Sequence, residues 1–226
     1  MIKKKQKSKR GMGKRKGSSY EREVCKLLSL WWTDEERDDV FWRTASSGGR
    51  ATQRSKTNQS TFGQYGDVQA TDPIGQPLID VCPIEIKRGY NKDTFSNLIE
   101  KSNRSSKNPT GYENFLIQCI NSAVEAGSPA WLLISQRDNR NGIISMPYSF
   151  YKKLKRYSNI EGAWFYTKVK LKGFESYKKI CLTTFNNFLQ SVSPNTIISM
   201  QKQIKNKQGD TDDPKNKKRT RRRKSV

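Results

Sequence analysis

The stretch Pro83-Ile84-Glu85-Ile86-Lys87 places two charged residues in an otherwise apolar segment. Side chains two residues apart share a face of a β-strand, so Glu85 and Lys87 would lie together, opposite Ile84 and Ile86. Burying such a pair is costly unless its charges are paired or used. The pattern alone favours equally a functional site and a cross-strand ion pair on a solvated sheet face.

A second carboxylate stands upstream of this segment. Asp67 follows Gly66 and opens an expected strand over 67–71, and a turn over 72–77 leads to an expected strand over 78–87. If these strands pair antiparallel, the carboxylate of Asp67 approaches that of Glu85. Another acid-x-Lys sequence, Asp213 to Lys215, has no strand around it, so the apolar context of Glu85 is what favours a site.

The remaining periodicity predicts an α/β fold, with a mixed β-sheet flanked by helices. A first amphipathic helix is expected over 18–32, with Ser18 and Glu21 as its capping box. A second runs from Tyr112 to Gly127, which would end it at the C-cap. The other expected elements are strands over 40–45, 131–135, 142–146, 163–170 and 179–183, and helices over 148–157 and from 184 onward.

Composition narrows the chemistry. The 226 residues include 44 Lys and Arg against 21 Asp and Glu, a net charge of +23, and no histidine. Without histidine, serine-histidine triads, His-ligated metal centres and imidazole bases are excluded, which leaves carboxylates, lysine, Ser, Tyr and Cys. The excess of positive charge predicts a polyanionic partner. Nucleic acid is favoured over a membrane because neither tail has an amphipathic apolar face.

The charge also divides the chain. Residues 1–17 contain nine basic residues and no acid, and residues 202–226 contain eleven basic residues and three acids. Such segments have little to bury, so we expect both to be disordered tails. One folded domain is expected over 18–201, with a mobile basic loop over 46–66.

Four scattered cysteines form no CxxC pair, which favours free thiols in a reducing compartment over zinc or disulfides. The basic N-terminus lacks a following apolar stretch, and the longest strongly apolar run, 130–134, is too short for a membrane span. We therefore expect a cytoplasmic protein without a signal peptide.

Two carboxylates that converge at a strand end suit a hard divalent cation. Mg²⁺ commonly takes one or two protein carboxylates and fills its other positions with water and phosphate oxygens. The bound ion lowers the pKa of its water and stabilises charge on the attacked phosphate. A nearby lysine such as Lys87 can hold the water or offset that charge. Asp67, Glu85 and Lys87 could thus form a hydrolytic site without histidine.

Four motifs occur in order: Lys16-Gly17-Ser18-Ser19-Tyr20-Glu21-Arg22-Glu23, Trp42-Arg43-Thr44-Ala45-Ser46-Ser47-Gly48, Gly66-Asp67-Val68-Gln69-Ala70 and Ile84-Glu85-Ile86-Lys87. This order resembles the PD-(D/E)XK nuclease superfamily and is most similar to archaeal-type Holliday junction resolvases and related phage nucleases. The resemblance covers residues 16–87, and the helix and strand over 112–135 fit the same restriction-endonuclease-like core. Gly66 replaces the usual proline. A long polar insert before Asp67 and an extension after Arg137 leave the substrate open.

The resemblance implies a role for each matching residue. Asp67 and Glu85 would bind the metal, helped by the Ile86 carbonyl, and Lys87 would orient the attacking water. Glu21 would be a first-helix catalytic acid, although a capping role also explains it.

Nucleic-acid contacts are implied as well. Arg43 would contact the scissile phosphate, or would be an exposed strand arginine. Gln118 lies where many superfamily members carry a site-lining polar residue, or is a solvated helix position. Further DNA contacts are expected from the loop residues Ser47, Arg50, Arg54 and Lys56, although the Ser/Gly stretch from Ser47 to Arg50 is also typical of a plain flexible loop.

The function expected from this resemblance is a Mg²⁺-dependent DNA endonuclease, with Mn²⁺ able to substitute, acting on branched DNA such as four-way junctions in a bacterial or phage-infected cell. A two-fold symmetric junction favours a homodimer. The alternatives are a phage or mobile-element nuclease of other DNA specificity and a non-catalytic nucleic-acid-binding protein with a nuclease-like fold. Core packing is expected for most of the tryptophans, rather than base stacking.

Overall fold

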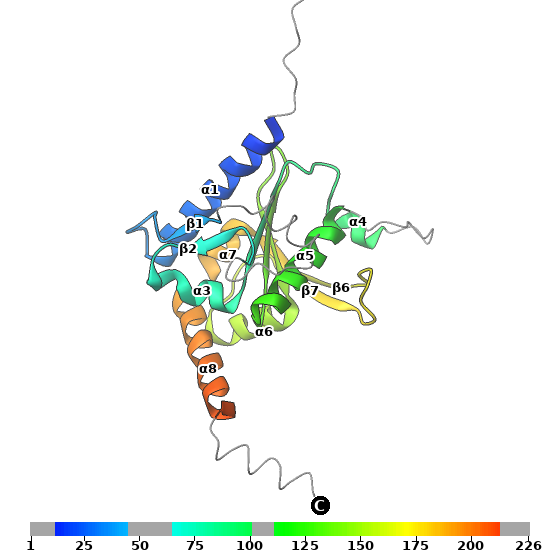
Figure 1. Ribbon diagram of the computed structural model, residues 1–226. Helices are drawn as coiled ribbons and strands as arrows, with labels where there is room; N and C mark the ends of the chain where they lie inside the picture. Colours follow the sequence, from blue (N-terminus) through cyan, green and yellow to red (C-terminus); the bar gives the residue numbers. More distant parts are fainter. Residues whose placement is uncertain (1–11, 45–64, 101–110, 213–226) are drawn as a thin grey trace, which may run out of the picture.

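The computed structural model describes residues 12–44, 65–100 and 111–212 (Figure 1). Its centre is a five-stranded sheet in the order β3-β4-β5-β7-β6. Only β3 and β4 pair in parallel, and the other neighbours are antiparallel. The predicted α/β class with a mixed sheet is confirmed. The strands are β3 (Ile84–Arg88), β4 (Leu132–Gln136), β5 (Ile143–Pro147), β6 (Phe165–Val169) and β7 (Lys178–Thr184).

Helices cover both faces of this sheet. Alternate residues of β4 show the division, because Leu132 and Ile134 join the larger apolar core whereas Leu133 joins a second, smaller one. α5 (Gly111–Ala126) and the short α4 (Ser96–Ile99) pack on the smaller core. The helices on the larger core are α1 (Met12–Trp32), α3 (Gln76–Val81), α6 (Tyr148–Tyr157), α7 (Phe185–Ser191) and α8 (Pro194–Asp212).

A small second sheet extends the fold beside β3. β1 (Phe41–Arg43) pairs antiparallel with β2 (Val68–Ala70). Just before β2, Gly66 forms a parallel bridge with Ile84. The expected antiparallel pairing between the Asp67 segment and the Glu85 strand is therefore wrong.

The reason is an extra helix between these segments. Residues 78–81 were expected in a strand, but the 3₁₀ turn η2 (Pro73–Gly75) leads into helix α3. Pro77 is tolerated in the first helical turn, and Leu78 and Val81, three residues apart, bury the same face. Because α3 carries the chain back to the end at which the Gly66 segment begins, β3 can run parallel to that segment.

The expected capping box is also wrong. α1 begins at Met12, so Ser18 lies inside the helix, where a capping geometry cannot form. Its hydroxyl accepts hydrogen bonds from Arg22 and Arg43 instead, at 3.0 and 2.8 Å. α1 and α8 thus continue beyond the expected domain limits of 18 and 201.

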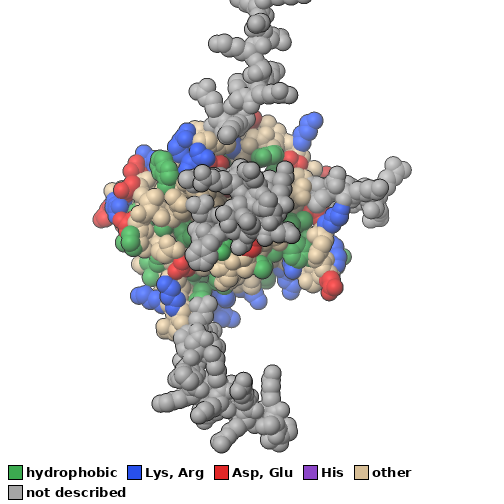
Figure 2. Space-filling view, in the orientation of Figure 1, with side chains coloured by type: hydrophobic (Ala, Val, Ile, Leu, Met, Phe, Trp, Pro, Cys, Tyr) green, Lys and Arg blue, Asp and Glu red, His purple; other side chains and the backbone are tan. Residues whose placement is uncertain are grey.

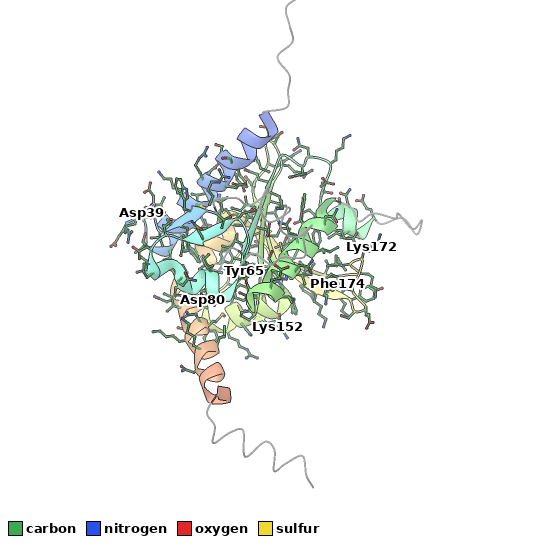
Figure 3. The ribbon with its side chains drawn as sticks, in the orientation of Figure 1. Asp39, Tyr65, Asp80, Lys152, Lys172 and Phe174 are labelled. Atoms are coloured by element: carbon green, nitrogen blue, oxygen red, sulfur yellow. The ribbon has the colours of Figure 1, made fainter. Side chains whose placement is uncertain are left out.

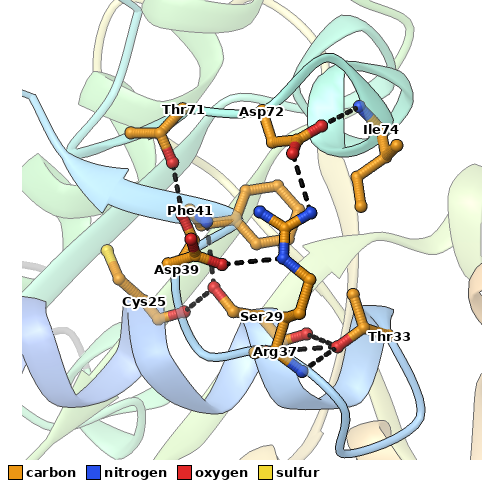
Figure 4. Close-up of polar contacts among 9 residues, drawn as sticks. All are labelled: Cys25, Ser29, Thr33, Arg37, Asp39, Phe41, Thr71, Asp72 and Ile74. Atoms are coloured by element: carbon orange, nitrogen blue, oxygen red, sulfur yellow. Dashed lines mark hydrogen bonds and ion pairs between the residues drawn. The ribbon is translucent and has the colours of Figure 1, made fainter.

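A polar network fixes the corner between α1, β1 and η2 (Figure 4). The hydroxyl of Ser29 accepts a hydrogen bond of 2.9 Å from the backbone N–H of Phe41. Arg37 pairs with Asp72 at 2.8 Å across the same corner. These contacts hold the start of β1, and so the position of Arg43 at its end. Within the described residues, no helix is long and apolar enough to cross a membrane.

Candidate active site

Three charged residues expected from the sequence meet at the edge of β3. The ammonium Nζ of Lys87 lies 3.0 Å from Oε2 of Glu85 and 3.7 Å from Oδ2 of Asp67. Ile84 and Ile86 point into the larger core on the other face, as the alternation predicted. Glu85 is only 2% exposed and Asp67 5%. One ammonium therefore contacts two buried carboxylates.

The backbone holds Asp67 in place. Its N–H donates to the Ile84 carbonyl at 2.7 Å, and its Oδ2 accepts from the Ile86 N–H at 2.8 Å. Gly66 has φ +80°, and a Cβ there would lie 2.6 Å from the Ile84 carbonyl oxygen. Proline, whose φ is fixed near −65°, cannot adopt this conformation. Glycine is therefore required by this approach of the two segments.

Helix α5 supplies two donors to Glu85. The Gln118 amide donates to Oε2 at 2.7 Å, and the Ser122 hydroxyl donates to Oε1 at 3.2 Å. Gln118 is thus a site-lining residue, one of the two alternatives for it. Ser122 was missed, although it follows Gln118 by four residues and so shares its helix face.

Burial and neighbouring charges together set the pKa values of Glu85 and Lys87. Burial raises the pKa of Glu85 to about 7, and the Asp67 carboxylate adds to this, whereas Lys87 opposes it. For Lys87, burial acts to lower the pKa, but the carboxylates of Glu85 and Asp67 outweigh it and the pKa is raised. Lys87 is therefore held as an ammonium ion.

Glu21 and Arg43 form a second charged pair beside the cluster. Nε of Arg43 lies 2.9 Å from Oε2 of Glu21, an ion pair too poorly aligned to count as a hydrogen bond. Burial raises the pKa of Glu21, and the Asp67 charge raises it further against the effect of Arg43. Glu21 is thus close enough to the cluster for the charge of Asp67 to affect its pKa. Arg43 is held in place by its contacts with Glu21 and Ser18.

The remaining expected contacts fall elsewhere. The loop over 46–66 is described only at Tyr65 and Gly66. The loop residues proposed to contact DNA, Ser47, Arg50, Arg54 and Lys56, lie outside the described residues.

Comparison with models of known protein families identifies the family of this chain. The family model "Phage putative PDDEXK endonuclease" matches residues 12–199. The chain belongs to this family of phage PDDEXK endonucleases. The match runs from the start of α1 into α8, and the predicted superfamily is thereby confirmed. Neither curated proteins nor solved structures give a significant match.

PDDEXK nucleases generally use divalent metals, so the metal-binding side chains of this chain can be compared with that requirement. Within the described ranges, no group of three or more His, Cys, Asp or Glu side chains could hold an ion. Asp67 and Glu85 nevertheless form an all-oxygen pair, which is what Mg²⁺ takes from proteins when water and phosphate complete its shell. With both ionised beside Lys87, the cluster has a net charge of −1. These residues fit a hard cation.

A cleft of about 230 Å³ adjoins Lys87. Its wall includes the rings of Tyr90 and Phe115 and the cationic side chains of Arg137 and Arg140. A larger cavity of about 370 Å³, lined in part by Tyr65 and Asp80 (Figure 3), does not reach the carboxylate pair. Aromatic and cationic groups therefore border the site on the Lys87 side.

Proposed function

We propose that this chain is a Mg²⁺-dependent endodeoxyribonuclease that hydrolyses phosphodiester bonds at Asp67, Glu85 and Lys87, with Mn²⁺ able to replace Mg²⁺. The observation that carries the proposal is the contact of one buried ammonium with two buried carboxylates, at 3.0 and 3.7 Å. A structural ion pair needs one carboxylate. The second adds repulsion that raises the pKa of Glu85, and an additional cation would relieve it.

Each residue then has a distinct task. Asp67 and Glu85 would hold the metal, with the Ile86 carbonyl assisting. The bound ion would make its water acidic and offset charge on the phosphate. Lys87, kept protonated, donates a hydrogen bond to the attacking water or to a phosphate oxygen and does not remove the proton. Direct attack by water, which would lose its proton to solvent, would form the new P–O bond as the bond to the leaving oxygen breaks, and would invert the configuration at phosphorus without a covalent intermediate.

The neighbouring groups support DNA binding at this site. Gln118 and Ser122 each donate to the Glu85 carboxylate and so hold it in one orientation. Arg43 pairs with Glu21 beside the cluster, and Arg137 and Arg140 line the cleft next to Lys87, so these cations could contact phosphates flanking the scissile bond. Glu21 would hold Arg43 in position and would interact electrostatically with the nearby carboxylate of Asp67.

For the substrate, we propose branched DNA such as a four-way junction, bound by a homodimer whose two-fold axis matches that of the junction. The ordered motifs over residues 16–87 support it. A phage nuclease that cuts linear, nicked or modified duplexes is the second candidate. It is favoured by the family match, which spans residues 12–199 and carries no junction specificity.

The test is cleavage of a labelled four-way junction and a sequence-matched linear duplex with Mg²⁺, Mn²⁺ or EDTA. Wild type should cleave with either metal and not in EDTA, and Asp67→Asn should be inactive. Asp38→Asn, which changes a surface carboxylate paired with Lys26, should retain full activity. Cleavage by Asp67→Asn would overturn the mechanism, whereas preference for the linear duplex would reject only the junction.

A further inference from the structure

Four aromatic rings form a continuous surface at the edge of the sheet far from Glu85. They are Tyr148 and Tyr151 of α6, Trp164 before β6, and Tyr166 within β6. Their neighbouring rings lie 5.1 to 5.8 Å apart with interplanar angles of only 29 to 34°. In the core, by contrast, Trp32 and Phe41 meet at 83°. We call these four rings the aromatic platform.

The platform is open to solvent. Tyr166 is 71% exposed, and the other three rings are half-buried, with one side packed on the larger core. The rings line a hollow of about 330 Å³. Core packing thus explains the inner sides of Tyr148, Tyr151 and Trp164 but not the hollow that the four rings line.

Positive charge surrounds this hollow. Lys152, Lys155 and Arg156 line it, and no acidic side chain among the described residues does so. Nζ of Lys152 lies 5.7 Å from the centre of the Tyr148 ring. Lys152 projects from α6 (Figure 3), and Figure 2 shows Lys and Arg side chains along the lower rim, where α6 lies in Figure 1. The hollow therefore suits an anionic ligand that also presents flat apolar faces.

The platform is separate from the catalytic cluster. β3 and β6 are the two opposite edges of the five-stranded sheet. The platform packs on the larger core, whereas Glu85 faces α5 on the other side of the sheet. DNA bound at the platform would leave the cleavage site unobstructed.

We propose that the aromatic platform binds an unpaired segment of DNA, with bases stacked on the rings and phosphates held by Lys152, Lys155 and Arg156. Single-stranded nucleic acids are bound in this way by proteins that combine stacking rings with a cationic groove. In duplex DNA the bases are paired and stacked inside the helix, so they present no free faces on which the rings could stack. The proposal rests on the proposed function in one respect, that the ligand is DNA. It adds that the protein prefers substrates with single-stranded parts.

The test measures binding without cleavage. Fluorescence anisotropy of labelled dT₂₀ is followed in EDTA with the full chain, for wild type and for Tyr148→Ala combined with Tyr166→Ala. Because one stacked base contributes about tenfold or more in affinity, the double variant should bind at least roughly tenfold more weakly. Its affinity for a 20-base-pair duplex should not change.

Matched variants locate the effect. Tyr177 is 64% exposed with Nζ of Lys170 5.8 Å from its ring centre, outside the platform, so Tyr177→Ala should leave dT₂₀ affinity unchanged. Tyr166→Phe, which keeps the ring, should bind as wild type. Lys152→Ala combined with Lys155→Ala keeps all four rings and should flatten the salt dependence of binding, by about 0.7 for each phosphate that is no longer neutralised. This variant decides the question if the tyrosine double variant fails to fold.

Three results would overturn the proposal: wild-type dT₂₀ affinity in a folded tyrosine double variant, an equal loss in Tyr177→Ala, or a double variant that loses binding to phosphatidylserine vesicles while its dT₂₀ binding persists. Asp67→Asn should bind dT₂₀ normally in EDTA. A failure of the nuclease proposal would therefore leave this binding measurement intact.

Discussion

The side-chain amide of Gln118 donates a hydrogen bond of 2.7 Å to Oε2 of Glu85, and this contact joins helix α5 to the charged cluster on β3. Glu85 is buried with a raised pKa, so a donor directed at its carboxylate favours the ionised form that a metal needs. The two partners are 33 residues apart in the sequence, so their contact depends on the packing of α5 against the sheet.

Removing that donor should weaken the site without unfolding it. Gln118→Leu should lower metal affinity and cleavage by roughly 10- to 100-fold, as is usual for groups that orient metal ligands. Because the pKa of Glu85 would rise further, the rising limb of the pH–rate profile should move to higher pH. Ser122→Ala removes a longer bond of 3.2 Å and should have a smaller effect. An unshifted pH profile in Gln118→Leu would show that Gln118 does not act through Glu85.

Lys87 should separate catalysis from metal binding. Lys87→Met removes the ammonium 3.0 Å from Glu85 and leaves both carboxylates, so Mn²⁺ affinity by isothermal titration should be retained or increased. Cleavage should fall by about 10²-fold or more, the usual cost of removing a donor that stabilises transition-state charge. Lys179→Met, which changes an exposed lysine of β7, serves as the control. Loss of Mn²⁺ binding in Lys87→Met would contradict this division of roles.

Glu85 should make the metal-free protein less stable as the pH rises. An unfolded glutamate ionises near pH 4.5, whereas in the folded chain the pKa of Glu85 is about 7. Between these values the folded state binds more protons, so the free energy of unfolding falls with rising pH, and below them the contribution is fully present. Glu85→Gln removes this dependence. Its amide could donate to Ser122 while its carbonyl accepts from Gln118.

Urea unfolding in EDTA checks this expectation. At pH 5 the two proteins should be similarly stable, and at pH 8 Glu85→Gln should be more stable by on the order of 2 kcal/mol. Glu125→Gln changes an exposed carboxylate of α5 as a control and should show no such gain. Equal stability at pH 8 would mean that Lys87 fully compensates Glu85.

Substitution by alanine should destabilise the protein far more at Gly66 than at a glycine elsewhere with the same backbone angle. Gly66 and Gly173 both have φ +80°, but only at Gly66 would a Cβ clash, 2.6 Å from the Ile84 carbonyl oxygen. Gly173→Ala should cost about 1 kcal/mol from backbone strain alone. Gly66→Ala should cost on the order of 3 kcal/mol and reduce cleavage, because the clash displaces Asp67. Thermal unfolding and cleavage assays compare the two, and equal losses would show that the clash is relieved.

Much of the site was accessible from local pattern. The alternation in Ile84 to Lys87 predicted which face carries the charges, and the helical spacing after Tyr112 predicted α5 with Gly127 at its end. The ordered motifs predicted the superfamily, which the family match confirms. Local geometry repeats every 2 or 3.6 residues, so such features can be read from a single segment.

Short segments with mixed signals could not be assigned in this way. Residues 78–81 have both a helical and a strand-like apolar pattern, and burial of Leu78 and Val81 on one face decided for the helix. Ser18 has the composition of a cap, but the helix had already begun at Met12. Propensity was overridden by the surrounding chain in both cases.

The sequence by itself determined which side chains are candidates for catalysis: it contains no histidine, and the motif order predicts Asp67, Glu85 and Lys87. Only the tertiary structure decided their relations. The parallel approach of Gly66 to Ile84 brings Asp67 beside Lys87, and α5 adds Gln118 and Ser122 to Glu85. Burial then raises the pKa of Glu85. Distances between segments and the removal of solvent depend on long-range packing, which no local spacing encodes.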